Sequence, residues 1–367
     1  MINHIYIDNF KCFVNFKYEP SSIELILGDN GSGKSSLFAI VRKLKDLVVE
    51  GSSSLTVFPG HELCQWSDNR EQSFEIGFKR DESVYRYQLR IEHDLQGAKN
   101  RISHEELKCD DVTLYRFDGK DAHLFKDDGS EGPTLAWDWN KSFLATVPER
   151  KENQKLTWFR ERMSKTFVFA PDPLGMSADS LAEVEMPDYQ LRNISSWLRH
   201  LFQEDLDAMT EIRDSLKQVM AGMKTFKHEK TSQKSRSLQF QFDFTDAGKD
   251  FWLPLDDLSD GQCQLVALYS IEHAMLKANR TVCIDEPDNF VALREIQPWL
   301  INAKDAVEDN DSQLWVISHN PELIDYLAAD HGVQFYRDEG GPVRTKRFDW
   351  KDEDVLKPSE IVARGWE

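Results

Sequence analysis

The chain has 367 residues, 40% of them hydrophobic, and a formal net charge of −19. This composition can bury the core of one large domain or two ordinary ones, which excludes global disorder. The acidic balance argues against a general nucleic-acid coat and against a protein that binds anionic membranes. No run approaches the ~18 apolar residues of a membrane span, and the N-terminus lacks a signal-peptide pattern. Five cysteines without a CxxC pair indicate neither disulfides nor a zinc site, so we expect a reduced, cytoplasmic protein.

The first third of the chain changes from a strand–helix pattern to an antiparallel β pattern. The apolar run at 23–27 stops at a glycine and predicts a buried strand, which a helix over 35–49 follows. Apolar and polar residues alternate over 73–91 around a charged turn at 79–83, which predicts an antiparallel hairpin. Further short strands lead to a polar linker at 127–133.

The rest of the chain is first helical and then alternates strands with helices. Helical spacing over 197–223 predicts one long helix or two shorter ones, far short of a long coiled-coil arm. Residues 224–236 form a polar segment with five Lys or Arg and one Glu, and strand alternation resumes at 237–244. From residue 281, strands separated by helices predict a parallel α/β sheet, and Gly340–Gly341 predicts a last hairpin.

A phosphate-binding loop is the clearest motif, because Gly28-x4-Gly33-Lys34-Ser35 fits the P-loop pattern between a strand and a helix. The glycines let backbone N–H groups point at phosphate oxygens, and the helix start adds its positive dipole end. Lys34 would neutralise the β and γ phosphates, and Ser35 would give a hydroxyl to Mg²⁺. The predicted nucleotide-binding residues of this loop are Gly28, Asn30, Gly31, Ser32, Gly33, Lys34, Ser35 and Ser36.

Acidic residues follow the apolar strand "TVCI" at Asp285 and Glu286. Asp285 would hold Mg²⁺ or its water shell, and Glu286 would act as the general base that polarises the attacking water. The alternative is an ordinary acidic turn after a strand. The phosphate-binding loop upstream favours the catalytic interpretation.

Two further motifs concern the γ-phosphate. The segment "LSDGQ" (258–262) looks like the LSGGQ signature of ABC-type ATPases, with Asp260 in place of the first glycine. Ser259, Gly261 and Gln262 at a helix start would form a second anion site that serves the nucleotide of another subunit. Ser259 could instead be only a helix N-cap. His319 follows an apolar strand, where a neutral imidazole could donate to the γ-phosphate, although a histidine in a turn is the simpler alternative.

These motifs together resemble the SMC, RecF, RecN and OLD group of ABC ATPases. "IDNFKCF" (7–13) ahead of "GDNGSGKSS" looks like the opening of that group, and Asn30 fits its phosphate loop. The resemblance implies a P-loop NTPase with an ABC-type ATPase head, an antiparallel β N-lobe and a helical insertion instead of a coiled coil. It implies ATP and Mg²⁺ as cofactors, and a glutamine loop for which Gln65, Gln72 and Gln154 are candidates.

The resemblance also implies a division of the chain and a biological role. We expect an N-lobe at 1–170, a helical insertion with a basic loop at 171–248 and a C-lobe at 249–367. The chain most resembles the compact bacterial AAA-family ATPases of the OLD-like branch, which recur in anti-phage gene pairs. In that branch the heads close on ATP and act on DNA or on a partner effector. Because only 48 residues follow His319, we expect no C-terminal Toprim nuclease of the OLD kind. In this family the segment after the position of Glu286 usually continues to a histidine-containing loop. Here "NFVALREIQPW" replaces that loop, so the contacts of the family's D-loop are undefined.

Three functions are compatible with the motifs. One is an ATP-gated switch in which a head dimer controls a separate effector protein. Another is a DNA-stimulated ATPase of repair, like RecF, and the weakest is a transporter subunit. The basic segment would distinguish the first two, either as phosphate contacts or as a solvated loop. The acidic balance favours a protein partner. The basic residues concerned are Lys224, Lys227, Lys230, Lys234 and Arg236.

Overall fold

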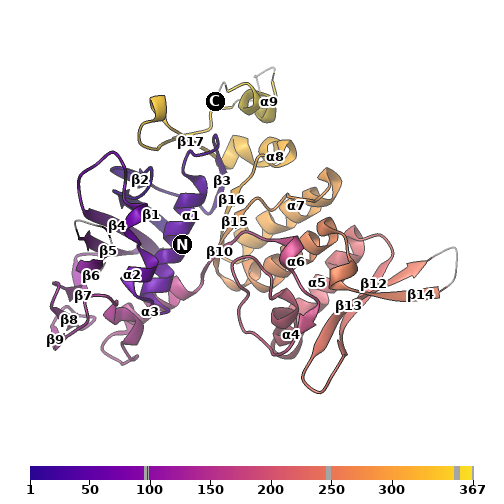
Figure 1. Ribbon diagram of the computed structural model, residues 1–367, viewed down its shortest axis with the longest axis horizontal. Helices are drawn as coiled ribbons and strands as arrows, with labels where there is room; N and C mark the ends of the chain where they lie inside the picture. Colours follow the sequence, from indigo (N-terminus) through magenta and orange to yellow (C-terminus); the bar gives the residue numbers. More distant parts are fainter. Residues whose placement is uncertain (95–96, 98, 245–248, 351–355, 366–367) are drawn as a thin grey trace. The chain divides into compact units, whose positions relative to one another are not determined.

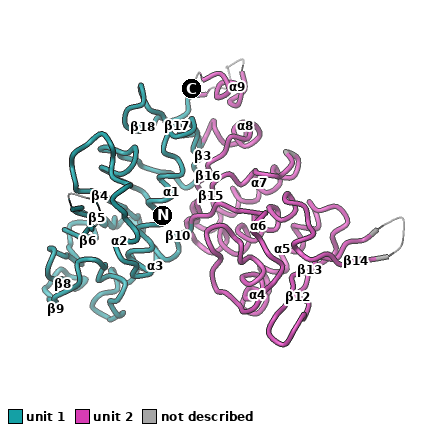
Figure 2. The backbone as a smooth tube through the Cα atoms, in the orientation of Figure 1, with its two compact units in different colours: residues 1–167, 331–349 teal, residues 168–330, 350–367 magenta. Residues whose placement is uncertain are grey.

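The computed structural model describes residues 1–94, 97, 99–244, 249–350 and 356–365. The chain forms two compact units, residues 1–167 with 331–349 and residues 168–330 with 350–367 (Figures 1 and 2). The chain therefore leaves the first unit and later returns to it. The predicted boundary at residue 248 lies outside the described residues, and the boundary at 170 remains a prediction. No helix in the described ranges is long and apolar enough to cross a membrane.

The first unit is built on an antiparallel sheet in the order β2-β1-β4-β5-β6-β7-β8-β9 (Figure 1). The hairpin predicted over 73–91 is confirmed as β4 and β5, with Phe74 opposite Leu89. The linker predicted at 127–133 is partly wrong, because β9 begins at Glu131. The strands are β1 (Ile2–Asp8), β2 (Phe16–Tyr18), β4 (Glu71–Arg80), β5 (Ser83–His93), β6 (Asn100–Cys109), β7 (Val112–Phe117), β8 (Asp121–Phe125) and β9 (Glu131–Ala136).

A smaller group of strands in the same unit carries the phosphate-binding loop. Every residue of β3 (Ile23–Leu27) is buried, and β3 pairs in parallel with β17 (Gly332–Tyr336). The predicted last hairpin is confirmed, because β17 pairs antiparallel with β18 (Arg344–Arg347). The predicted first helix is α1, whose apolar residues recur at three- and four-residue steps and are buried. The helices of this unit are α1 (Lys34–Val48), α2 (Ser54–Val57) and α3 (Gln154–Ser164).

The second unit combines helices with two parallel strands. A further strand, β10 (Thr166–Phe169), comes earlier in the chain. The parallel α/β prediction is confirmed here, because β15 (Thr281–Asp285) and β16 (Gln313–Ile317) pair in parallel. The helical stretch predicted over 197–223 is two helices, since Asp205 ends one and caps the next by accepting from Ala208 N–H. The helices are α4 (Ile194–Glu204), α5 (Leu206–Val219), α6 (Asp260–Ala274), α7 (Leu293–Asp309), α8 (Pro321–His331) and α9 (Pro358–Ala363).

Residues 224–230 of the basic segment lie in a strand, residues 231–235 form the turn that follows it, and Arg236 begins the next strand, so the prediction of a polar loop is partly wrong. β12 pairs antiparallel with β13 over its length, and alternate side chains point inward. Phe226 is buried, and His228 Nε2 lies 2.8 Å from the carbonyl oxygen of Ser195. The burial of these alternate residues explains the difference from the prediction. The strands of this sheet are β11 (Asp179–Ser180), β12 (Met223–Lys230), β13 (Arg236–Phe244) and β14 (Lys249–Pro254).

Candidate nucleotide-binding site

The loop between β3 and α1 has a backbone that requires glycine. Gly28, Gly31 and Gly33 have φ angles of 136°, 79° and 98°, a region that other residues rarely adopt. A Cβ on Gly28 would lie 2.1 Å from the carbonyl oxygen of Phe335 in β17, so a side chain has no room there. A Cβ on Gly31, by contrast, would meet no atom of the described residues within 4 Å. The loop thus packs against β17 at Gly28, whereas at Gly31 there is space beside the backbone.

The start of α1 is suited to bind an anion. Gly33 is its N-cap, and no side chain in the described part of the chain caps the helix, so its first N–H groups remain available to a ligand. Lys34 is buried and donates to the carbonyl oxygens of Gly28 and Asp29, at 2.5 and 3.0 Å. Ser32 Oγ is buried without a hydrogen-bond partner among the described residues, and a phosphate oxygen would satisfy such a donor. These features fit a polyphosphate.

The carbonyl oxygen of Gly31 in this loop accepts a hydrogen bond that no sequence motif indicates. Arg337, just after β17, donates to the carbonyl oxygen of Gly31 at 3.2 Å and to that of Gly341 at 2.7 Å. Its guanidinium also lies 4.9 Å from the ring centroid of the half-exposed Trp66. Because 306 residues separate Arg337 from Gly31 in sequence, no local pattern could have indicated this contact.

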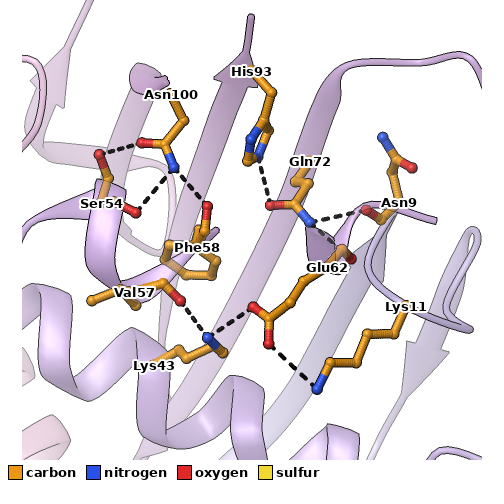
Figure 3. A network of polar contacts seen from close by, with 10 residues as sticks. All are labelled: Asn9, Lys11, Lys43, Ser54, Val57, Phe58, Glu62, Gln72, His93 and Asn100. Carbon is orange, nitrogen blue, oxygen red and sulfur yellow. Dashed lines mark hydrogen bonds and ion pairs between the residues drawn. The ribbon is translucent and has the colours of Figure 1, made fainter. Parts of the chain in front are cut away.

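The structure distinguishes among the candidate glutamines. Gln72 is fully buried in β4, where it donates to the carbonyl oxygen of Asn9 and lies 3.0 Å from His93 Nε2 (Figure 3). The same network includes Glu62, which forms ion pairs with Lys11 and Lys43 (Figure 3). These contacts give Gln72 a structural role inside the first unit.

The two other glutamines are more accessible. Gln65 precedes Trp66, whose ring contacts the Arg337 guanidinium. Arg337 in turn donates to Gly31 in the phosphate loop. The side chain of Gln65 donates to the nearby carbonyl oxygen of Leu63. Gln154 begins α3, and its backbone N–H donates to Asp127. Of the three, Gln65 is the one whose segment is connected to the phosphate loop.

The predicted catalytic acids lie at the end of β15 in the second unit. Asp285 is the last residue of the strand, and Glu286 follows with its side chain exposed. The Glu286 backbone N–H donates to Ile317 in β16, which fixes its main chain. The carboxylate of Asp285 is an oxygen ligand of the kind that Mg²⁺ prefers, and in the first unit the exposed hydroxyl of Ser35 is another. Both remain predicted metal ligands.

A third acid, Asp288, lies beside these residues. It accepts a hydrogen bond of 2.6 Å from Ser318 Oγ, the residue before His319. Burial raises the pKa of the Asp288 carboxyl, and the nearby Glu286 carboxylate adds to the rise, whereas the hydrogen bond from Ser318 opposes it. His319 is exposed and follows Ser318, the first residue after β16. The structure thus brings Glu286, Asp288 and His319 together at neighbouring strand ends.

The predicted signature is the N-terminus of α6. Ser259 is the N-cap, and its hydroxyl accepts from Gln262 N–H at 3.3 Å while the Gln262 side chain accepts from Ser259 N–H at 3.0 Å. Ser259 is therefore a helix cap, and because it is also exposed, its role in a signature remains a prediction. A Cβ on Gly261 would lie 2.6 Å from the carbonyl oxygen of Phe290, so only glycine fits this close approach.

A groove in the second unit opens beside the signature. Its volume is about 870 Å³, and the exposed residue Phe290 is one of those that line it. Ser259, Asp260, Gly261 and Gln262 all line it, so the signature residues share one accessible surface. The predicted residues therefore form one group in the first unit and another in the second.

The fold is that of an ABC-type P-loop ATPase head of the SMC kind. The chain is similar to the crystal structure of the SMC head bound to the C-winged-helix domain of ScpA, with a TM-score of 0.56. The identity is 14%, over 94% of this chain and 98% of that one. The SMC head with an extended coiled coil bound to the C-terminal domain of ScpA, derived from Pyrococcus furiosus, gives a TM-score of 0.53. The identity is 11%, over 94% and 96%.

Comparison with family models then assigns the chain to a particular family. Residues 25–325 match the AAA domain described as a putative AbiEii toxin of a type IV TA system, and the chain belongs to this family. The matched range contains the phosphate loop, the signature, the strand-end acids and His319. No curated protein sequence matches the chain.

Proposed function

We propose that this chain binds and hydrolyses ATP, that two copies close on the nucleotide, and that the closed pair switches a partner effector. The observation that carries the proposal is the phosphate loop, where left-handed glycines, an uncapped helix start and a buried lysine coincide. Such a loop binds the β and γ phosphates of a nucleoside triphosphate. Membership in an AAA domain family supports ATP as that nucleotide.

Each predicted residue then has a chemical role. Lys34 would leave its loop carbonyls for the β and γ phosphates, and the N–H groups of Gly31 and of Gly33 to Ser36 would bind the remaining oxygens. Mg²⁺, held by Ser35 and Asp285, would neutralise charge on the phosphates. Glu286 would take a proton from the attacking water, and His319 would donate to the γ-phosphate.

The signature supports the pairing of heads. The groove beside Ser259 and Gly261 is large and open, and we propose that the phosphate loop of a second copy occupies it. Asp260 departs from the usual glycine and places a carboxylate in the first turn of α6. Because it would repel a γ-phosphate, we expect closure to be weaker here than with glycine.

The charges of the second unit favour a protein effector over DNA. Lys224 forms ion pairs with Asp243 and Asp250, and Lys227 with Glu229, so these cations are already neutralised. The family description names a toxin of a type IV TA system, and both SMC heads above were solved with a partner domain. We therefore propose a two-protein system in the bacterial cytoplasm, acting in anti-phage defence.

Two substitutions test the ATPase. Lys34→Ala should abolish ATP binding, measured by calorimetry, because the phosphates lose their counter-charge. Glu286→Gln should bind ATP with Mg²⁺ and hydrolyse it very slowly, because an amide cannot accept the water proton. Near-normal ATP affinity in Lys34→Ala would contradict the assignment of the phosphate loop, and wild-type turnover in Glu286→Gln would place the base elsewhere.

The same variants test the switch. In the presence of ATP, Glu286→Gln should accumulate as a closed pair and retain the protein encoded by the neighbouring gene during purification. Lys34→Ala should do neither. Stimulation of wild-type hydrolysis by duplex DNA, lost when Lys230, Lys234 and Arg236 are neutralised together, would favour the repair ATPase instead.

A further inference from the structure

The turn that follows β15 holds the side chain of Glu286. The backbone N–H of Asn289 donates to the carbonyl oxygen of Glu286 at 3.3 Å, and Asn289 Nδ2 donates to Glu286 Oε2 at 2.7 Å. A carboxylate only accepts hydrogen bonds, so the amide must direct its NH₂ group at it. Glu286 has a φ of 52°, a left-handed conformation that is strained for any residue other than glycine. Such strain persists only where surrounding contacts enforce it.

Neighbouring elements enforce the main chain of this turn. Glu286 N–H donates to Ile317 in β16 at 2.8 Å, and Gln264 Nε2 of α6 donates to the carbonyl oxygen of Pro287 at 2.8 Å. Ser318 holds Asp288 as described above. The backbone of Glu286 and Pro287 is thus fixed by hydrogen bonds to β16 and α6. Among the described residues, Asn289 alone donates a hydrogen bond to the exposed Glu286 side chain and so sets its direction.

The two carboxylate oxygens of Glu286 are therefore unequal. Oε2 accepts from Asn289, whereas Oε1 has no hydrogen-bond partner in the part of the chain that the structure describes. A general base needs one oxygen that is free to accept the proton of water, and a fixed orientation that presents this oxygen. The arrangement around Glu286 meets both requirements.

We propose that Asn289 is a positioning residue for Glu286, an inference that rests on the proposed ATPase. The Asn289 amide holds Oε2, so that Oε1 faces the attacking water. In the reaction, a water O–H bond breaks and its proton passes to Oε1. The water oxygen forms a bond to the γ-phosphorus, and the bond to the bridging oxygen breaks with its electron pair on ADP. Asn289 is unchanged throughout.

The test begins with Asn289→Ala. Removing a hydrogen bond to a charged group should lower kcat about tenfold to hundredfold, with ATP affinity and thermal stability near those of the wild type. Asn289→Asp has the same shape but places a second carboxylate against Oε2, so its loss should be larger. The matched control is Asn310→Ala, which removes an amide that donates to Ala306 at 2.8 Å, and kcat should not change.

A double-mutant cycle separates positioning from a merely structural effect. When Asn289→Ala is added to Glu286→Gln, the single-turnover rate should stay at the value of Glu286→Gln alone, because the carboxylate on which Asn289 acts is gone. A further tenfold loss in the double variant would overturn the proposal, as would wild-type kcat in Asn289→Ala. If Glu286→Gln itself turns over at the wild-type rate, the assignment of the base fails, and the positioning role fails with it.

Discussion

A buried carboxylate in the signature helix allows a sharp test of the second unit. Glu272 in α6 is 1% exposed, and its Oε1 lies 3.5 Å from Nε2 of the neighbouring His273. Burial raises the pKa of Glu272 from 4.5 to about 8. The folded protein therefore binds a proton that the unfolded chain releases above pH 4.5, and stability falls as the pH rises toward 8. Glu272→Gln removes this dependence, since an amide does not ionise.

The expected size follows from the pKa of Glu272. Each pH unit between the unfolded and folded values costs about 1.4 kcal/mol, and the cost levels off as the folded carboxyl ionises near pH 8. The free energy of unfolding of Glu272→Gln, relative to that of the wild type, should therefore be about 3 kcal/mol higher at pH 8 than at pH 5.5. His273, whose pKa burial lowers to about 4, destabilises both proteins alike as the pH falls below 6.5.

Urea unfolding followed by tryptophan fluorescence at the two pH values measures this difference, with the m-value compared at each. Glu204→Gln, an exposed carboxyl at the end of α4, is the matched control and should show no pH-dependent gain. A constant difference between Glu272→Gln and the wild type at both pH values would refute the raised pKa of Glu272.

Three more predictions concern the signature. Gly261→Ala should lower the free energy of unfolding by about 1 kcal/mol, because the overlap of its Cβ with the Phe290 carbonyl exceeds the gain in helix propensity; an unchanged urea midpoint would contradict this. Asp260→Gly should strengthen ATP-dependent pairing in size-exclusion chromatography, and weaker pairing would argue against a γ-phosphate at this helix start. Ser259→Arg and Lys34→Ala should each be inactive alone and regain hydrolysis when mixed. The control links two heads in one chain, one with Ser259→Arg and the other with Lys34→Ala. If this linked pair does not hydrolyse ATP while a linked pair with one wild-type site does, Ser259 is only a helix cap.

Local patterns predict the elements that carry strong periodicity. The buried strand β3 and the amphipathic α1 follow from apolar spacing, whereas spacing alone does not show that Asp205 divides the long helical stretch into two helices. β9 escapes such a prediction because it is mostly exposed and shows no alternation of apolar residues. β12 escapes it because its lysines obscure the inward alternation of Phe226 and His228.

In the candidate site, too, local sequence patterns predict some residues and not others. Glycines, lysine and acids appear in sequence as motifs, because their chemistry depends on neighbours in the chain. Arg337 contacts Gly31 and Gln72 contacts Asn9, which lie far away in sequence, so no spacing could predict these contacts. Asn289 lies within hydrogen-bond reach of Glu286 along the chain, but its amide could have faced many partners. Only the left-handed turn directs it to the carboxylate.

The return of the chain to the first unit has a consequence for synthesis on the ribosome. β3 and the phosphate loop are made early, whereas β17, which pairs with β3 and whose Phe335 carbonyl lies against Gly28, is made some 300 residues later. At the ~5–20 residues per second of translation, the loop would lack this support for tens of seconds. A nascent chain stalled before residue 331 should therefore carry the complete motif without its backing strand, and nucleotide could stabilise the first unit only after that strand emerges.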